Sequence, residues 1–141
     1  MFAAAVVSFS ALAQTPKDVK YVFTEASDLN LIGKIHENTP NPYHRVDTVK
    51  YKGFTKGENS QVRCPAGLAV LFKTNSTTIS VKTDFGWEYT STTTMPQAYR
   101  GYDLYIKKKD NWVYAASRAP KHNDPDGKNV VLIENMDGQE K

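Results

Sequence analysis

The chain has 141 residues, enough for one domain with a single hydrophobic core. Hydrophobic residues make up 40%, aromatic residues 11% and charged residues 23%, as in an ordinary globular protein. The formal net charge of +3 is small, so the charge balance requires neither a nucleic acid nor a membrane as a partner. The single cysteine, Cys64, excludes an internal disulfide, and we expect it to be a buried structural thiol.

The first 13 residues have the pattern of a secretory signal peptide. Residues 2–12 are apolar but too few to span a bilayer, and Ala11-Leu12-Ala13 provides the small residues of a cleavage site before polar Gln14. The basic residues that usually precede such a stretch are missing, because the first is Lys17. We still expect a signal peptide over residues 1–13, export to the periplasm or the cell exterior, and no membrane span.

The mature chain, residues 14–141, consists mostly of short apolar or alternating stretches between turn residues, which is typical of an all-β protein. The expected strands are residues 19–23, 29–35, 43–54, 61–64, 68–72, 77–83, 99–107, 112–116 and 130–133. No segment has the pattern of an amphipathic helix, and the expected loops are residues 53–60, 91–94 and 121–128. The apolar run 68–72 predicts a central strand buried on both faces, joined to residues 77–83 by a hairpin. A β-sandwich fits this pattern best, although periodicity does not distinguish it from a barrel.

Residues 99–107 give the clearest strand pattern in the chain. Alternation predicts one face with Tyr102, Leu104 and Ile106 and another with Asp103, Tyr105 and Lys107. A second strand starts at Trp112, and Asp110-Asn111 are the residues expected in the left-handed turn of a hairpin. Gly101, inside the first strand, indicates a bulge or a close approach of another backbone.

The segment Gly101-Tyr102-Asp103-Leu104-Tyr105 matches the pattern Gly-x-Asp-Leu-Tyr. Four further blocks with a family pattern, three before this segment and one after it, lie at residues 41–47, 51–54, 70–76 and 131–138. On these residues, from about residue 29 to residue 138, the chain resembles the N-terminal β-domain of bacterial SGNH/GDSL-type hydrolases. The resemblance implies a jelly-roll-like, mostly antiparallel β-sandwich, the motif residues Gly101, Asp103, Leu104 and Tyr105, and a catalytic domain that follows in the same polypeptide.

The catalytic residues of an SGNH hydrolase are not in this sequence. The nucleophilic Ser lies in a Gly-Asp-Ser context, and the base is a His with Asp three positions earlier. Gly-Asp-Ser is absent, and the positions three before His36, His44 and His122 hold Gly33, Asn41 and Ala119. We assign no catalytic residue here and expect the Ser and His beyond Lys141. Asp137-Gly138 is a turn signal followed by three residues, which predicts a C-terminally incomplete domain with its last strand at an exposed edge.

Metal and nucleic-acid sites are not expected. His122, Asp124, Asp126 and Gly127 have the spacing of a calcium loop, but neither His122 at the first position nor Ile133 at the twelfth supplies a carboxylate. We expect a solvated turn there, with no metal and no cofactor. The three lysines at residues 107–109 are expected to be a solvated hairpin tip rather than a nucleic-acid site.

Aromatic residues concentrate between residues 87 and 114, namely Trp87, Tyr89, Tyr99, Tyr102, Tyr105, Trp112 and Tyr114. Because the C–H faces of sugars pack on aromatic rings, the candidate ligand-binding residues are Trp87, Tyr89, Tyr99 and Arg100. The plainer interpretation is that the rings form the core and its edges, since Tyr and Trp favour strands. Asp103 is expected to have a structural role rather than a catalytic one.

The sequence is compatible with two functions and, less well, with a third. The first is an accessory N-terminal domain of an exported SGNH/GDSL-like hydrolase, a carbohydrate (acetyl) esterase whose partner is its own downstream catalytic domain. The second is a stand-alone, non-catalytic carbohydrate-binding β-sandwich module with a polysaccharide as its ligand. The third is an assembly domain that associates through open strand edges.

Overall fold

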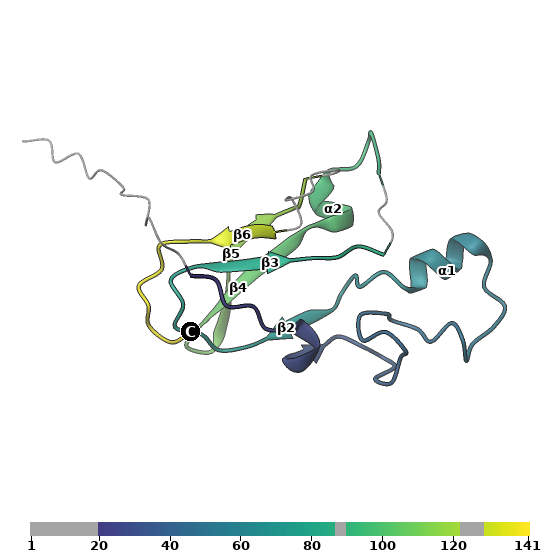
Figure 1. Ribbon diagram of the computed structural model, residues 1–141, viewed down its shortest axis with the longest axis horizontal. Coiled ribbons are helices and arrows are strands. Elements are labelled where there is room, and N and C mark those ends of the chain that lie inside the picture. The colour runs from purple at the N-terminus through teal and green to yellow at the C-terminus, as the bar shows by residue number, and fades with distance from the viewer. Residues whose placement is uncertain (1–19, 87–89, 122–128) are drawn as a thin grey trace, which may run out of the picture. The chain divides into compact units, whose positions relative to one another are not determined.

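The computed structural model describes residues 20–86, 90–121 and 129–141, which divide into two compact units, Met1–Val70 and Leu71–Lys141. The elements in chain order are the 3-10 helix η1 (Ala26–Asp28), β1 (Asn30–Ile32), α1 (Lys56–Val62), β2 (Ala69–Leu71), β3 (Ile79–Lys82), α2 (Pro96–Arg100), β4 (Tyr102–Lys108), β5 (Asn111–Arg118) and β6 (Asn129–Ile133) (Figure 1). Strand residues outnumber helical ones, and the prediction of an all-β protein is confirmed at that level.

The first unit contains a close contact between two backbone segments. β1 hydrogen-bonds with β2, and Gly33, which follows β1, has a φ of +89°. A Cβ atom at Gly33 would lie 2.2 Å from the carbonyl oxygen of Gly67, so a side chain fits neither the space nor the backbone conformation. The predicted hairpin between residues 68–72 and 77–83 is wrong, because β2 pairs with β1 and β3 pairs with β6. β2 also lies in a two-stranded sheet and is not buried on both faces.

In the long connection between β1 and α1, side chains form hydrogen bonds with backbone groups. The Lys34 ammonium donates to Thr39 Oγ1 at 2.6 Å and to the Pro42 carbonyl at 2.8 Å. The Thr39 hydroxyl donates in turn to the Asn41 carbonyl at 2.7 Å. Further along, the Asp47 carboxylate accepts from the N–H groups of Val49 and Lys50. Such local bonds compete with a strand ladder, and the predicted strand at residues 43–54 is wrong. The predicted strand at residues 19–23 is also wrong over residues 20–23, and residue 19 lies outside the described residues.

α1 replaces a predicted loop and a predicted short strand. Thr55 and Glu58 form a capping box, in which the Thr55 N–H donates to the Glu58 carboxylate at 2.7 Å and the Thr55 hydroxyl accepts from the Glu58 N–H. These hydrogen bonds lower the pKa of the Glu58 carboxyl. The helix has no apolar periodicity, which is why its pattern predicted a loop. Cys64, just beyond α1, is half-buried rather than buried, and its Sγ donates to the Ser60 carbonyl.

We expect Thr55→Ala to lower the free energy of unfolding of the first unit by about 1 kcal/mol, because it removes the side-chain half of the cap. The loss should appear as a lower urea midpoint with an unchanged slope. Thr92→Ala, at an exposed position in a polar loop, is the matched control and should leave the midpoint within experimental error. Equal midpoints for the two variants would contradict a stabilising cap.

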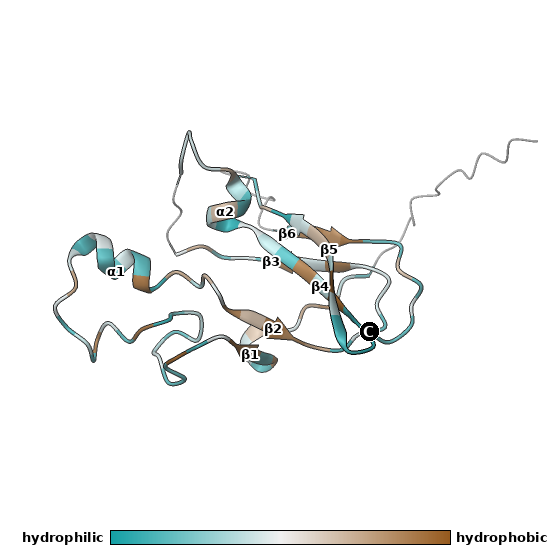
Figure 2. Cartoon of the chain, turned by 180° about the vertical axis from the view of Figure 1, so that it is seen from behind, coloured by the Kyte–Doolittle hydropathy of each residue, from teal (hydrophilic) through white to brown (hydrophobic). Residues whose placement is uncertain are grey.

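The second unit is built from two antiparallel ribbons, β3 with β6 and β4 with β5. Figure 1 shows β6 lying beside β3, and in Figure 2 the hydrophobic colour falls on parts of β3 to β6 while the β4–β5 turn is hydrophilic. Three residues form the core, with exposed fractions of 8% for Leu104, 6% for Ala116 and 5% for Leu132. Partly buried hydrophobic residues surround them, namely Ile79, Val81, Tyr102, Ala115, Val130 and Ile133. The predicted last strand is confirmed as β6.

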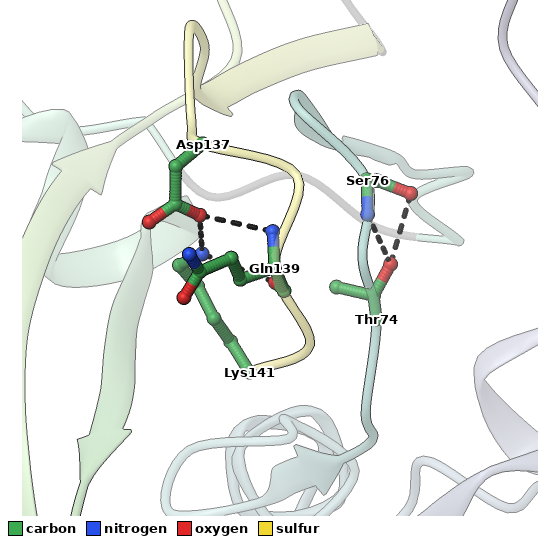
Figure 3. Close-up of polar contacts among 5 residues, drawn as sticks. All are labelled: Thr74, Ser76, Asp137, Gln139 and Lys141. Carbon is green, nitrogen blue, oxygen red and sulfur yellow. Dashed lines mark hydrogen bonds and ion pairs between the residues drawn. The ribbon is translucent and has the colours of Figure 1, made fainter.

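The last residues of the second unit return to the segment that precedes β3. The Lys141 N–H donates to the Thr74 carbonyl at 2.9 Å, and the Met136 N–H donates to the Thr77 carbonyl at 2.9 Å. Figure 3 shows the Asp137 carboxylate accepting from the Gln139 N–H and from the Lys141 ammonium. The hydrogen bond from Lys141 lowers the pKa of Asp137. The two backbone hydrogen bonds hold the last residues of the chain against residues 74–77.

A partly buried hydrogen bond connects the two ribbons. The Tyr102 phenol of β4 bonds to the hydroxyl of Thr83, which directly follows β3. Burial raises the pKa of the Tyr102 phenol above its usual range, and the bond to Thr83 opposes this rise. The folded protein therefore favours the neutral phenol, and its stabilising contribution is complete below the unfolded pKa of about 10.

We expect Tyr102→Phe to lower the free energy of unfolding by about 1 kcal/mol at neutral pH, because the Thr83 hydroxyl loses its partner. As the pH rises through the raised pKa of Tyr102, the wild type loses the contribution of the neutral phenol while the variant does not. The difference between the two proteins should therefore shrink above about pH 10, measured by urea unfolding at several pH values. A difference that stays constant up to pH 11 would contradict a preferentially neutral Tyr102.

Candidate functional site: the outer face of the β4–β5 hairpin

Gly101 joins α2 to β4 at a point where a side chain has no room. Its N–H donates to the Gln97 carbonyl at 3.1 Å and closes the last turn of α2. A Cβ atom there would lie 2.3 Å from that oxygen and 2.5 Å from the Gln97 Cα. The prediction of a close backbone approach at Gly101 is confirmed, whereas its placement inside a strand is wrong, because the strand begins only at Tyr102.

The other residues of the Gly-x-Asp-Leu-Tyr segment divide between the two faces of β4. Leu104 faces the core and is buried. Asp103 and Tyr105 alternate with it, so they lie on the opposite, outer face, and both are exposed. The segment therefore combines two residues that the fold requires, Gly101 and Leu104, with two that the fold leaves at the surface.

A β-bulge decides which residues of β5 join this outer face. Leu104 pairs with Ala116, but Tyr105 pairs with Tyr114, so Ala115 is the extra residue. Without the bulge Tyr105 would pair with Ala115. Trp112 and Tyr114 would then lie on the core face of the hairpin. The bulge thus places Trp112 and Tyr114 on the same face as Tyr105. Of the two alternatives predicted for Gly101, the close backbone approach holds, and the bulge lies instead at Ala115 of β5.

Three aromatic side chains are more than half exposed on this outer face, with fractions of 51% for Tyr105, 55% for Trp112 and 57% for Tyr114. The Tyr105 and Tyr114 rings meet edge to face, with centroids 5.8 Å apart and planes at 72°. The Lys107 ammonium lies 6.0 Å from the centroid of the Trp112 ring. We call these three rings the aromatic strip. Exposed apolar groups gathered in this way indicate an interaction surface.

The hairpin tip beside the aromatic strip is strongly basic. Lys108 pairs with Asn111, and the two residues of the turn are Lys109 and Asp110. The left-handed residue is Lys109, with a φ of 55°, so the prediction of Asp110-Asn111 is wrong by one position. Lys107, Lys108 and Lys109 are all exposed, which agrees with a solvated tip. Among the residues that the structure describes, no carboxylate forms an ion pair with these three lysines.

The structure describes two of the four residues predicted to bind a ligand, Tyr99 and Arg100, and neither is part of this surface. Trp87 and Tyr89 lie outside the described residues. Tyr99 and Arg100 are half-buried in the last turn of α2, with the Arg100 guanidinium 5.4 Å from the Tyr99 ring centroid. The predicted strand over residues 99–107 is wrong for these two, because Pro96 at the first helical position starts a short helix instead. The rings exposed on this face are those of Tyr105, Trp112 and Tyr114, which the sequence analysis counted in the aromatic cluster but did not select as ligand candidates.

A shallow groove of about 370 Å³ runs between β5 and β6 in the second unit. Its walls are mostly small or aliphatic, with Arg118 and Glu134 as the charged residues. In the first unit, burial lowers the pKa of His44, and nearby Arg63 and Lys34 lower it further.

Within residues 20–86, 90–121 and 129–141, no three side chains of His, Cys, Asp or Glu are placed to hold a metal ion. The predicted calcium-like turn at residues 122–127 lies outside this range.

Comparison with known families identifies the whole described region. The family model described as "GxDLY: N-terminus of Esterase_SGNH_hydro-type" matches residues 19–141. The chain belongs to this family. Its Gly-x-Asp-Leu-Tyr signature is the segment at residues 101–105, which runs from the end of α2 into β4.

A solved structure shares the fold of this GxDLY domain. It is a crystal structure from Bacteroides ovatus whose protein is named as GDSL-like lipase, with 32% sequence identity and a TM-score of 0.67. The match covers 82% of the GxDLY chain and 33% of the other chain, so this chain spans about a third of the length of that protein. The comparison with curated proteins finds no match. In the described part of the GxDLY domain, none of the helices has both the length and the apolar character to cross a bilayer.

Proposed function

We propose that this chain is the accessory N-terminal domain of an exported SGNH/GDSL-type ester hydrolase. The observation that carries the proposal is the family match over residues 19–141, together with a longer similar protein that is named as a GDSL-like lipase and of which the match covers 33%. The Ser and His of the reaction would lie in the part of the polypeptide beyond Lys141. Strands β3 to β6 would belong to a jelly-roll-like sandwich, because two antiparallel ribbons already share one core.

The substrate we propose is an acetyl ester on a polysaccharide. The polypeptide that contains both this domain and the hydrolase domain should release acetate from acetylated xylan. Its kcat/KM for 4-nitrophenyl acetate should exceed that for 4-nitrophenyl palmitate at least tenfold. A preference for the long acyl chain would contradict the acetyl esterase and point to a lipase instead.

Export by cleavage after Ala13 is part of the same proposal. The first residue of the exported protein should be Gln14, as determined by N-terminal sequencing of the protein recovered outside the cytoplasm. Recovery of a protein that retains residues 1–13 inside the cell would contradict export.

A stand-alone carbohydrate-binding module is the second candidate, and the three exposed rings of the aromatic strip favour it. In affinity electrophoresis through xylan the chain alone would then be retarded. Trp112→Ala would remove the retardation, with Val49→Ala in the first unit as an exposed control. Trp87→Ala and Tyr89→Ala test the two predicted residues outside the described region in the same assay. Migration equal to that in a plain gel would exclude this second function.

A further inference from the structure

The aromatic strip is the largest group of exposed rings that the described part of the second unit carries on one sheet face. Its members, Tyr105, Trp112 and Tyr114, are each more than half exposed. The opposite face of the same two strands already packs on the core through Leu104 and Ala116. The outer face of this ribbon therefore has no partner in the described structure. Exposed aromatic surface of this kind is usually covered in the functional protein.

The exposed area of the rings would suit a sugar, but their arrangement fits a protein partner better. A sugar stacks on the open face of a ring. Here the Lys107 ammonium occupies one face of Trp112 at 6.0 Å, and the Tyr105 and Tyr114 planes stand at 72° to each other. These rings therefore form an uneven, interlocking surface of the kind that packs against protein side chains. Tyr and Trp are also the residues that contribute most to protein interfaces.

The similar protein is longer than this chain, and its additional region is a candidate partner for the aromatic strip. The GxDLY domain corresponds to 33% of that chain, so a region about twice as long accompanies it there. We propose that the outer face of β4–β5 is the surface on which the hydrolase domain of the same polypeptide packs, with acidic side chains of that domain opposite Lys107, Lys108 and Lys109. This inference rests on the proposed function. It assigns the outward half of the family segment, Asp103 and Tyr105, to the contact between the two domains.

The positive charge of the hairpin tip indicates that the partner surface is acidic. Three exposed lysines without a carboxylate partner in the described residues produce a positive rim beside the rings. Charged rims fix the orientation of two docked surfaces more than they add affinity. An acidic rim on the hydrolase domain would therefore orient it on the strip.

Hydroxyl-radical footprinting of the complete polypeptide tests the contact. After correction for intrinsic reactivity, Tyr105, Trp112 and Tyr114 should be modified at least fivefold more slowly than Met95, which is 69% exposed and lies outside the strip. Replacing all three tip lysines by Glu should reduce the protection to less than twofold, whereas Lys52→Glu in the first unit should leave it unchanged. Modification of the three rings at the rate of Met95 would overturn the docking surface. Protection that appears only after acetylated xylan is added would overturn it too, in favour of a sugar site.

The same preparation separates this inference from the function on which it rests. Hydrolysis of 4-nitrophenyl acetate with unprotected rings removes the docking surface and leaves the proposed function intact. Protected rings without hydrolysis keep the contact and contradict the ester hydrolase. The variants should fold, because all the substituted side chains are exposed.

Discussion

Gly101→Ala is expected to lower the free energy of unfolding by about 2–3 kcal/mol, the cost of forcing extra atoms into a packed site. The new Cβ would lie 2.3 Å from the Gln97 carbonyl oxygen and 2.5 Å from the Gln97 Cα. Both are backbone atoms, so the last turn of α2 must move for the side chain to fit. The φ of Gly101 is −84°, which any residue adopts, so the cost is steric and not conformational.

Gly57→Ala is the matched control for this substitution. Gly57 lies in α1 and has open space around the position of a Cβ. There the same change should raise the free energy of unfolding by about 0.5–1 kcal/mol, because alanine favours the helix. Urea unfolding of both variants gives the comparison. Equal small effects at the two positions would contradict the close approach of α2 to Gly101.

Leu104→Ala is expected to lower the free energy of unfolding by about 3 kcal/mol, since it leaves a cavity in the core of the second unit. The described core of that unit has three buried hydrophobic residues, and Leu104 is one of its two large members. A core this small has few neighbours that can move to fill the space. Leu132→Ala should have a similar effect for the same reason.

Two controls distinguish burial from residue type. Ile35→Ala, at a side chain that is 91% exposed, should change the free energy of unfolding by less than about 0.5 kcal/mol. Tyr105→Ala, next to Leu104 but on the outer face, should cost less than about 1 kcal/mol. A Tyr105 variant as unstable as the Leu104 variant would show that the outer face is needed for folding and is not an interaction surface.

Alternation predicted the central elements of the second unit well. The period of two in residues 102–107 and the apolar run at residues 130–133 correspond to β4 and β6, because half-buried strands leave this pattern in the sequence. The family resemblance, carried by residues 101–105 and by blocks along the chain, is confirmed by the family model.

Pairing and short helices could not be predicted from the same pattern. β3 pairs with the distant β6, and no local signal in residues 77–83 identifies that partner. α1 is held by the Thr55 and Glu58 cap instead of an apolar face, and α2 has five residues, too few for helical periodicity. Capping boxes do leave a sequence signal, Thr-x-x-Glu, which is present at residues 55–58 and would have located α1.

The candidate site depends on the β-bulge in β5, which the alternation of residues in the sequence does not reveal. The extra residue at Ala115 turns Trp112 and Tyr114 to the face of Tyr105. A regular strand would have placed them opposite, so the aromatic residues alone could not indicate which rings are exposed together. Two of the four predicted ligand residues lie instead in α2, where they are half-buried.

The most direct test of the account is ester hydrolysis by two proteins from the same gene, this chain alone and the polypeptide that extends through the hydrolase domain. With 4-nitrophenyl acetate, this chain alone should give the rate of buffer, because no catalytic Ser or His is assigned to it. The longer polypeptide should hydrolyse the ester, and should lose that activity when the Ser of its Gly-Asp-Ser block is replaced by Ala. Hydrolysis by this chain alone, or none by the longer polypeptide, would contradict an accessory domain that precedes an ester hydrolase.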